Sequence, residues 1–207
     1  MIYKPMPWRN YRIGCYYLRQ TPFSKIPMDH VKTCKLYEHN DISQVIKCLD
    51  LLGQVKWRIN KNVLDVVEYS WANGGGVGEI PKRYNDRTIT RNIINETVDR
   101  VDKLKLLKES QNNRELHSLR CDFMIKLTIA RNFAKCNEIY YPHNIDYRGR
   151  AYPISPHLNH IGNDICRGLL EYSEKKALGK SGLRWLKVNL SYFMFRSILR
   201  MLLEKIS

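Results

Sequence analysis

Two arginines and an aspartate lie within the five-residue segment Asp146-Tyr-Arg-Gly-Arg150. Arg148 and Arg150 flank Gly149, so two guanidinium groups border a stretch of backbone that carries no side chain. Guanidinium groups bind phosphate oxygens through two parallel hydrogen bonds, and a bare backbone lets such a ligand come close. Asp146 is placed to hold one of the guanidinium groups. The spacing therefore predicts a turn that binds a phosphate-bearing ligand.

Aromatic and polar residues surround this segment. Tyr147 and Tyr152 provide flat faces that can stack on bases or sugars, or can instead fill a hydrophobic core. Asn159 and His160 follow closely in the sequence. For His160 two interpretations stay open: a functional group, or a buried histidine that satisfies neighbouring backbone.

The elements that must position the turn are short. The runs 138–142 and 150–154 have β-like composition and predict a small antiparallel ribbon that flanks the turn. Three prolines keep this ribbon at a sheet edge. Asp164 is a candidate N-cap for a helix that continues through Leu170, and 179–190 predicts a further helix.

Upstream, two shorter helices are expected. The first begins at Asp41, which is a candidate N-cap, and the second follows Asn60 and runs to Trp71. The glycine run 74–76 ends the second helix. This run does not predict a phosphate-binding loop, because no Gly-Lys-Ser/Thr sequence follows it.

Residues 86–137 contain no proline or glycine, and they predict two long helices with a break at 110–113. The second helix carries an apolar stripe (Leu116, Leu119, Phe123, Leu127, Ala130, Ala134) with Arg120, Arg131 and Lys135 along one edge of it. From Arg100 to Lys135 there are nine basic and four acidic residues. This modest basic face is either a solvated surface or a nucleic-acid contact.

The overall charge favours a polyanionic partner. The 207 residues include 35 Lys and Arg against 20 Asp and Glu, which gives a net charge of +15. Such a surplus, joined to aromatic residues and an arginine motif, is typical of nucleic-acid-binding proteins, although a basic environment that merely tolerates such charge is the alternative. Charged residues interrupt every apolar run before the ~20 residues of a spanning helix, so no membrane partner is expected.

The six cysteines show no Cys-x-x-Cys pair and are interpreted as reduced thiols. His30, Cys34, His39 and Cys48 have irregular spacings that do not favour a zinc site. We therefore predict no metal ligands in this chain.

A family resemblance extends outward from the arginine motif. The motif, together with Tyr152-Pro153, Pro156-His157, Asn159-His160 and Gly162-Asn163-Asp164, resembles the single-subunit, bacteriophage-type DNA-directed RNA polymerases, and most of all their mitochondrial branch. The likeness continues through Arg167–Glu171 and Leu178–Lys187, with weaker matches at Pro7-Trp8, Tyr16–Leu18 and Trp57–Asn60. It covers most of the chain from about Pro5 to Leu190.

The resemblance implies a mostly helical α+β fold. Residues 1–85 would form the end of an amino-terminal domain, 86–137 a thumb-like helical hairpin, and 138–190 the start of a palm with its ribbon and first helices. Residues 191–207 depart from the family pattern and form a divergent tail. The chain would then be a fragment or truncated form of a polymerase.

The resemblance also implies nucleotidyl transfer by a parent enzyme that uses two Mg²⁺ ions, DNA template, RNA:DNA hybrid and nucleoside triphosphates. The family's metal-binding aspartates lie beyond the matched segment, so we predict no catalytic residue in this chain, no bound cofactor and no activity of the chain alone. The residues that would contact template and hybrid are Arg148, Arg150, Asp146, Gly149, Tyr152, Arg167, Arg120 and Arg131. The alternative is a truncated, non-catalytic nucleic-acid-binding or interaction protein.

By resemblance the location is mitochondrial, with mitochondrial transcription factors as further partners. The first eight residues carry neither a signal-peptide core nor an amphipathic presequence. The sequence does not distinguish a plastid from a mitochondrial address.

Overall fold

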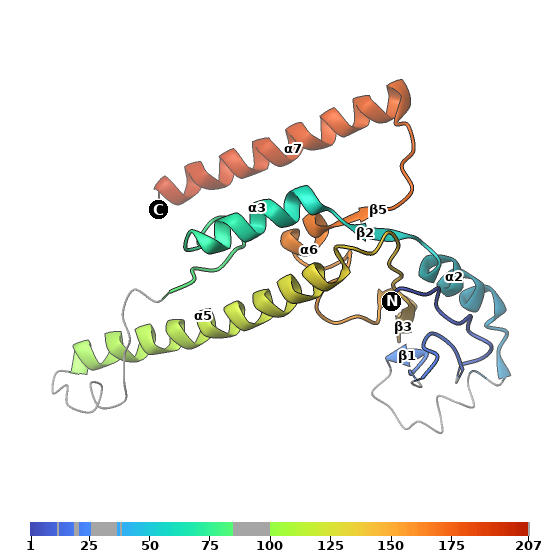
Figure 1. Cartoon of the computed structure of the whole chain (residues 1–207). Helices are drawn as coiled ribbons and strands as arrows, with labels where there is room; N and C mark the ends of the chain where they lie inside the picture. Colours follow the sequence, from blue (N-terminus) through green and yellow to red (C-terminus); the bar gives the residue numbers. More distant parts are fainter. Residues whose placement is uncertain (12, 19–20, 26–36, 38, 85–99, 207) are drawn as a thin grey trace. The chain divides into compact units, whose positions relative to one another are not determined.

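A computed structural model describes the chain except for residues 12, 19–20, 26–36, 38, 85–99 and 207, and without the side chains of 193 and 196–206. It divides into two units, Met1–Ser173 and Glu174–Ser207, which we describe separately. The first unit contains β1 (Ser24–Lys25), α2 (Ser43–Gly53), β2 (Trp57–Ile59), α3 (Lys61–Ala72), α5 (Arg100–Phe133), β3 (His143–Asp146), β4 (Ala151–Pro153), α6 (Asp164–Leu169) and β5 (Leu170–Tyr172) (Figure 1). The second contains α7 (Gly179–Ile206). Helices combine with small sheets, so the α+β class is confirmed, while the thumb and palm assignments and the domain boundaries stay predictions.

Two small sheets join distant parts of the first unit. One has the strand order β1-β3-β4, in which β1 is parallel and β4 antiparallel to β3. The other pairs β2 with β5 in antiparallel register, with Trp57 opposite Tyr172. Each sheet therefore ties a segment from the first 60 residues to one from 140–172.

Two hydrophobic clusters hold this unit together. The larger lies among α3, α5, α6 and the β2–β5 pair, and includes Phe123, Leu127 and Leu169. The smaller is centred on Trp8, Phe23 and the β1 region. Burial of apolar area in both clusters is the main stabilising contribution.

The expected break at 110–113 is wrong, because α5 is one continuous helix of 34 residues. Ser110, Asn112 and Asn113 have only moderately poor helix propensity, and neither proline nor glycine interrupts the backbone. Whether a second helix precedes α5 concerns residues 85–99, which lie outside the described residues. Along the predicted stripe Phe123, Leu127 and Ala130 are buried, whereas Leu119 is exposed.

The starts of α2, α3 and α6 agree with the sequence to within a residue or two. Asn60 caps α3 as expected, since its side chain accepts a hydrogen bond from the backbone N–H of Val63. Asp41 does not cap α2 directly; Ile42 holds the cap position, and the Asp41 carboxylate accepts from the N–H of Ser43. For α6 the cap is Asn163, one residue before the expected Asp164. After α3, Gly74, Gly75 and Gly76 have positive φ angles and form the expected turn.

The ribbon around the arginine motif exists, but its first strand lies further along the chain than expected. The strand is His143–Asp146 rather than 138–142, and it pairs with Ala151–Pro153. Tyr140 and Tyr141 are buried in extended chain instead, and Ile139 bridges to Trp57. Their β-like composition thus reflects burial against the core rather than membership of the ribbon.

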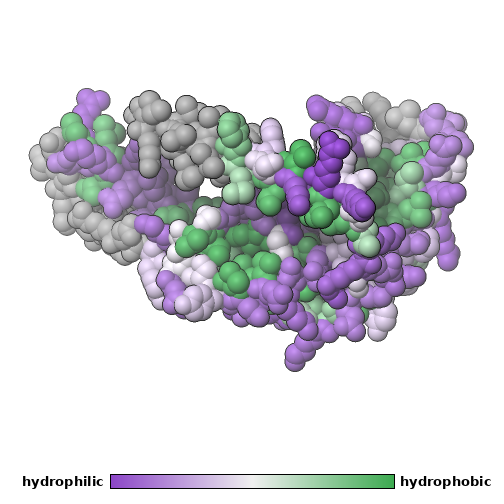
Figure 2. Space-filling model, turned by 90° about the horizontal axis from the view of Figure 1, so that it is seen from above, coloured by the Kyte–Doolittle hydropathy of each residue, from purple (hydrophilic) through white to green (hydrophobic). Residues whose placement is uncertain are grey.

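Hydrophobic residues also reach the surface. Figure 2 shows green hydrophobic residues between purple hydrophilic ones on the viewed face. Among the described residues, no helix has the length and apolar character needed to cross a membrane.

Candidate nucleic-acid interface

The arginine turn, which we define as residues 146–150, joins β3 to β4. The backbone N–H of Gly149 donates to the carbonyl of Asp146 at 3.0 Å, and the N–H of Asp146 donates to the carbonyl of Arg150 at 2.9 Å. Gly149 has a φ of 78°, in the left-handed region that glycine adopts without steric cost. The turn is therefore a tight, hydrogen-bonded connection whose backbone conformation favours glycine at position 149.

The Asp146 carboxylate organises the turn from within. One oxygen accepts hydrogen bonds from the backbone N–H groups of Arg148 and Arg150, both at 2.9 Å. The other accepts from Nε of Arg150 at 2.9 Å. Burial raises the pKa of this carboxyl, but the hydrogen bonds from Arg150 and Arg148 outweigh it, so the net pKa of Asp146 is lowered. This confirms that Asp146 is placed to hold one guanidinium.

The two guanidinium groups of this site each lie over an aromatic ring. The Arg148 guanidinium lies 5.0 Å from the centroid of the Tyr147 ring, and that of Arg150 lies 5.9 Å from the Tyr152 ring. Within the described part of the chain, no carboxylate pairs with Arg148. Among the described contacts, the exposed turn thus presents one guanidinium without a carboxylate partner, Arg148, and one that is partly engaged by Asp146, Arg150.

Lys25 is a further cation at this site that the sequence did not indicate. In the parallel register of β1 and β3, Lys25 is the strand neighbour of Asp146. The Nζ atom of Lys25 lies 5.3 Å from the centroid of the Tyr152 ring. The two residues are far apart in sequence, and β1 is only two residues long. No local pattern could therefore have placed Lys25 beside the turn.

The other predicted arginines contact other parts of the protein. Arg120 donates to the carbonyls of Leu116 and Arg83, which attaches α5 to the loop before it. Arg131 pairs with Glu68 at 2.6 Å and so joins α5 to α3. Arg167 is exposed and pairs with Asp164 within α6. The structure thus brings together the 146–150 turn and Tyr152, but no described contact links Arg120, Arg131 or Arg167 to them.

The described contacts of His160 are with other side chains and not with backbone, and they are of the kind that a structural histidine makes. Its ring stacks on Trp57 with centroids 4.8 Å apart, and its Nε2 lies 3.4 Å from Nε2 of His143. Burial first, and then the neighbouring His160, lower the pKa of His143 to about 4, and burial lowers the pKa of His160. The pair therefore consists of two neutral imidazoles, one donating to the other, and one of them, His143, is the first residue of β3.

Asn159 is also structural. Its side chain donates to the carbonyl of Ser155 at 2.9 Å and accepts from the N–H of Ile161 at 3.1 Å. These two hydrogen bonds fix the loop that precedes α6.

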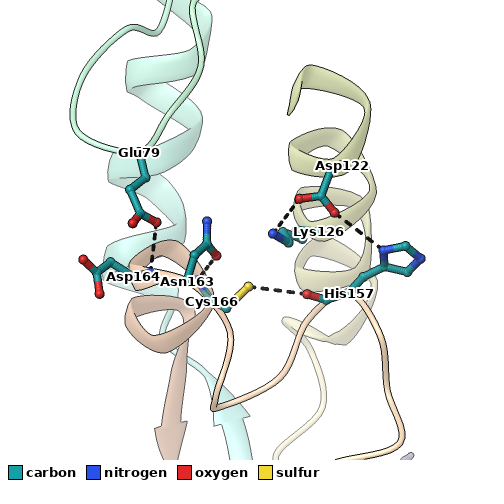
Figure 3. A network of polar contacts seen from close by, with 7 residues as sticks. All are labelled: Glu79, Asp122, Lys126, His157, Asn163, Asp164 and Cys166. Atoms are coloured by element: carbon teal, nitrogen blue, oxygen red, sulfur yellow. Dashed lines mark hydrogen bonds and ion pairs between the residues drawn. The ribbon is translucent and has the colours of Figure 1, made fainter. Parts of the chain in front are cut away.

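A second polar network lies away from the turn, between α5 and α6 (Figure 3). Asp122 pairs with Lys126 at 2.6 Å and with Nδ1 of His157 at 3.7 Å, while the Cys166 thiol donates to the His157 carbonyl. Glu79 accepts from the N–H of Asp164. A cleft of about 370 Å³ lies beside these residues, floored by Leu116, Leu119 and Phe123. Every group in the network has a partner within the protein, so it fastens the loop 78–81 and α6 to α5.

No metal centre is found in the described chain, where no group of three or more His, Cys, Asp or Glu side chains could hold an ion. Of the residues that the sequence raised for zinc, His30 and Cys34 lie outside the described residues.

Comparison with known proteins shows to which proteins this chain is related. DNA-directed RNA polymerase 3B, chloroplastic, of Nicotiana tabacum is 43% identical over 198 residues, which cover 92% of this chain and 20% of that protein. The chain is homologous to one segment of the organellar DNA-directed RNA polymerases. DNA-directed RNA polymerase 1, mitochondrial, of Arabidopsis thaliana is 40% identical over 203 residues, again covering 92% of the chain and 20% of the relative.

The chain spans about a fifth of the length of these polymerases. A third relative, DNA-directed RNA polymerase 2, chloroplastic/mitochondrial, of Nicotiana sylvestris, is 39% identical over 211 residues, with 99% of the chain and 20% of the relative covered. This match includes most of the tail 191–207, which the sequence alone set apart. No protein-family model matches the chain. The expected resemblance to the polymerases is confirmed.

Proposed function

We propose that the chain is part of a DNA-directed RNA polymerase that transcribes organellar DNA, and that this part holds template and RNA:DNA hybrid by their phosphates. The relatives carry mitochondrial, chloroplastic or dual names, so the proposed setting is either organelle. DNA template, hybrid and nucleoside triphosphates are the proposed partners of the parent enzyme.

The arrangement of the arginine turn is the observation that carries this proposal. Asp146 fixes the backbone of Arg148 and Arg150, and Gly149 leaves the backbone between them bare. Lys25 adds a third cation. Phosphate contacts of this kind supply affinity without sequence preference, as a polymerase requires while it moves along any template.

Mg²⁺ would act in the parent enzyme, as its catalytic mechanism implies. The aspartates near the turn do not fit such an ion. The Asp146 carboxylate already accepts three hydrogen bonds, and Asp164 pairs with Arg167. Both carboxylates lie next to positive charge, which opposes binding of a divalent cation. No catalytic step is assigned to this chain.

The test is binding of the 207-residue chain to an RNA:DNA hybrid across a salt series. We expect Arg148→Ala/Arg150→Ala to weaken binding by about tenfold or more, because charge-assisted hydrogen bonds are lost. The slope of log affinity against log salt should fall by about 2, or roughly 0.9 for each phosphate contact.

Two further variants separate charge from geometry. Arg148→Lys/Arg150→Lys keeps the charge but removes the planar forks, so we expect weaker binding with nearly the original salt slope. Lys175→Ala/Lys176→Ala removes the same charge from an exposed segment outside the first unit and should change binding little. Equal losses in the two alanine pairs would show that only net charge matters and would remove the role of the turn.

A further inference from the structure

Strand β1 ends in an exposed lysine, Lys25, beside the arginine turn. The chain just before this lysine is held by buried contacts. Phe23 is 2% exposed and meets the Trp8 ring edge to face, with centroids 5.2 Å apart, and its carbonyl accepts a hydrogen bond from the N–H of Ile145 at 3.0 Å. A buried anchor two residues away therefore fixes the backbone from which the lysine side chain extends.

The charge of Lys25 is not neutralised by a carboxylate of the described residues. Asp146, its strand neighbour, already accepts two backbone hydrogen bonds on one oxygen and the Nε of Arg150 on the other. Among the described residues, no ion pair joins Lys25 to an acidic group. Three cations, Lys25, Arg148 and Arg150, thus surround one carboxylate, and the surplus of positive charge attracts an anion.

One aromatic ring brings two of these cations close together. The Nζ of Lys25 lies 5.3 Å from the centroid of the Tyr152 ring, and the guanidinium carbon of Arg150 lies 5.9 Å from it. The two cations cannot be farther apart than these distances taken end to end, which is about three of the ~3.4 Å axial steps between phosphates in one strand of a duplex. Both cations can therefore reach the same short stretch of one strand.

We propose that Lys25 is a further phosphate contact of this site, and that it binds the same nucleic-acid strand as Arg150 at a neighbouring phosphate. This inference rests on the proposed function of the arginine turn. An ammonium group binds phosphate oxygens as a point charge, whatever the base, and its four-carbon stem adapts to the position of the strand. The contact therefore adds affinity without sequence preference.

The position of Lys25 on β1 also couples nucleic-acid binding to the docking of this strand. Lys25 lies beside the turn because β1 pairs with β3, so a strand bound by both favours the docked state of β1, and by linkage docking favours binding. The hydrogen bond from the N–H of Ile145 to the carbonyl of Phe23 reports this docking, since it breaks when β1 separates from β3.

The first test measures binding of the 207-residue chain to an RNA:DNA hybrid over a salt series. Lys25→Met removes the charge but keeps an unbranched stem that can pack on the Tyr152 ring. We expect the slope of log affinity against log salt to fall by about 0.9, the value for one phosphate, so that binding is about eightfold weaker at about 0.1 M salt and unchanged at about 1 M. Lys25→Arg should keep the wild-type slope.

Lys61→Met is the matched control for the loss of one positive charge. Lys61 is also an exposed lysine of the first unit, but it begins α3, which packs against α5 and α6. This variant should change neither the affinity nor the salt slope appreciably. Equal losses in Lys25→Met and Lys61→Met would show that binding responds only to net charge, and would overturn the proposal.

Combination with Arg148→Ala/Arg150→Ala shows whether Lys25 contacts a phosphate itself or only supports the arginines. A contact of its own predicts a further fall of about 0.9 in the salt slope when Lys25→Met is added to the double variant. A triple variant with the slope of the double variant would overturn the proposal. A loss in the double variant, with Lys25→Met like the wild type, would keep the proposed function and remove only this inference, whereas absence of hybrid binding by the wild type would remove both.

Residue-resolved hydrogen exchange tests the coupling to β1. Saturating hybrid should slow the exchange of the Ile145 N–H in the wild type but not in Lys25→Met. The Trp57 N–H, which donates to the carbonyl of Ile139 away from β1, is the internal control and should exchange at the same rate with and without hybrid. Equal slowing at Ile145 in the two proteins would show that docking of β1 does not depend on Lys25, and would overturn the coupling.

Discussion

At the scale of single residues, the conformation of the arginine turn depends most directly on Gly149. An alanine at this φ angle costs about 1–2 kcal/mol, because its Cβ approaches the following carbonyl. Apart from Gly149 and its two neighbours in the chain, no atom of the described residues lies within 4 Å of the position where a Cβ would be placed, so the cost is one of backbone conformation and not of packing. We expect Gly149→Ala to lower the free energy of unfolding in urea by that amount and to weaken hybrid binding.

Gly149→Asn is the matched control, since asparagine adopts the left-handed region more readily than alanine. It should retain more stability and more binding than Gly149→Ala. If alanine and asparagine behaved alike, the positive φ angle would not limit the turn.

His143 gives a pH dependence at the same scale. Its pKa is about 4 when folded against an ordinary 6.5, so between these values the unfolded chain binds the extra proton. Stability therefore rises with pH across this window and is lost as the pH falls from 6.5 toward 4. Urea unfolding of the wild type at several pH values measures this slope.

In His143→Gln the slope across that window should be smaller, whatever the absolute stability of the variant. A wild-type slope in His143→Gln would assign the pH dependence to other groups.

At the scale of elements, the continuity of α5 leads to a sharp prediction. Asn112 is exposed in the middle of this helix, where proline removes a hydrogen bond and clashes with the preceding turn at a cost of about 3 kcal/mol. We expect Asn112→Pro to reduce the helix content measured by circular dichroism, and Asn112→Ala to preserve it. Tolerance of proline would restore the two-helix interpretation of this segment.

Local sequence patterns could predict the elements whose capping or turn residues lie within a few positions of one another. Asn60 followed by an apolar period predicted α3, and the sequence from Asp146 to Arg150 predicted a turn between two strands. The choice between Asn163 and Asp164 as the cap of α6 could not be made, because adjacent residues of equal capping ability give the same pattern.

The rest of the site depends on contacts between distant residues. The pairing of β1 with β3 brings Lys25 to the turn, and a two-residue strand carries no periodic signal of its own. The side-chain contacts of Arg120 and Arg131 likewise arise only when α5 packs against α3 and the preceding loop. A basic helix edge in the sequence could not reveal that these two arginines contact protein groups.

At the scale of the whole molecule, we expect the purified 207-residue chain to make no RNA on a primed DNA template with Mg²⁺ and the four nucleoside triphosphates. Asp146 and Asp164 are both held by arginines, and the described residues contain no group that could take an ion. Incorporation of labelled nucleotides measures this. Templated product from a preparation free of other polymerases would contradict it.

The three-stranded sheet also affects the order in which the contacts of the arginine turn can form during synthesis. The chain leaves the ribosome from its N-terminus, and the neighbours of β1 are made long before those of β3: the contact between Pro22 and Asn144 spans 122 residues. The β3–β4 hairpin can close locally and fast, whereas docking of β1 requires closure of a large loop. We therefore expect Asp146 to shape the turn before β1 docks, and Lys25 to reach the Tyr152 ring only when the large loop closes.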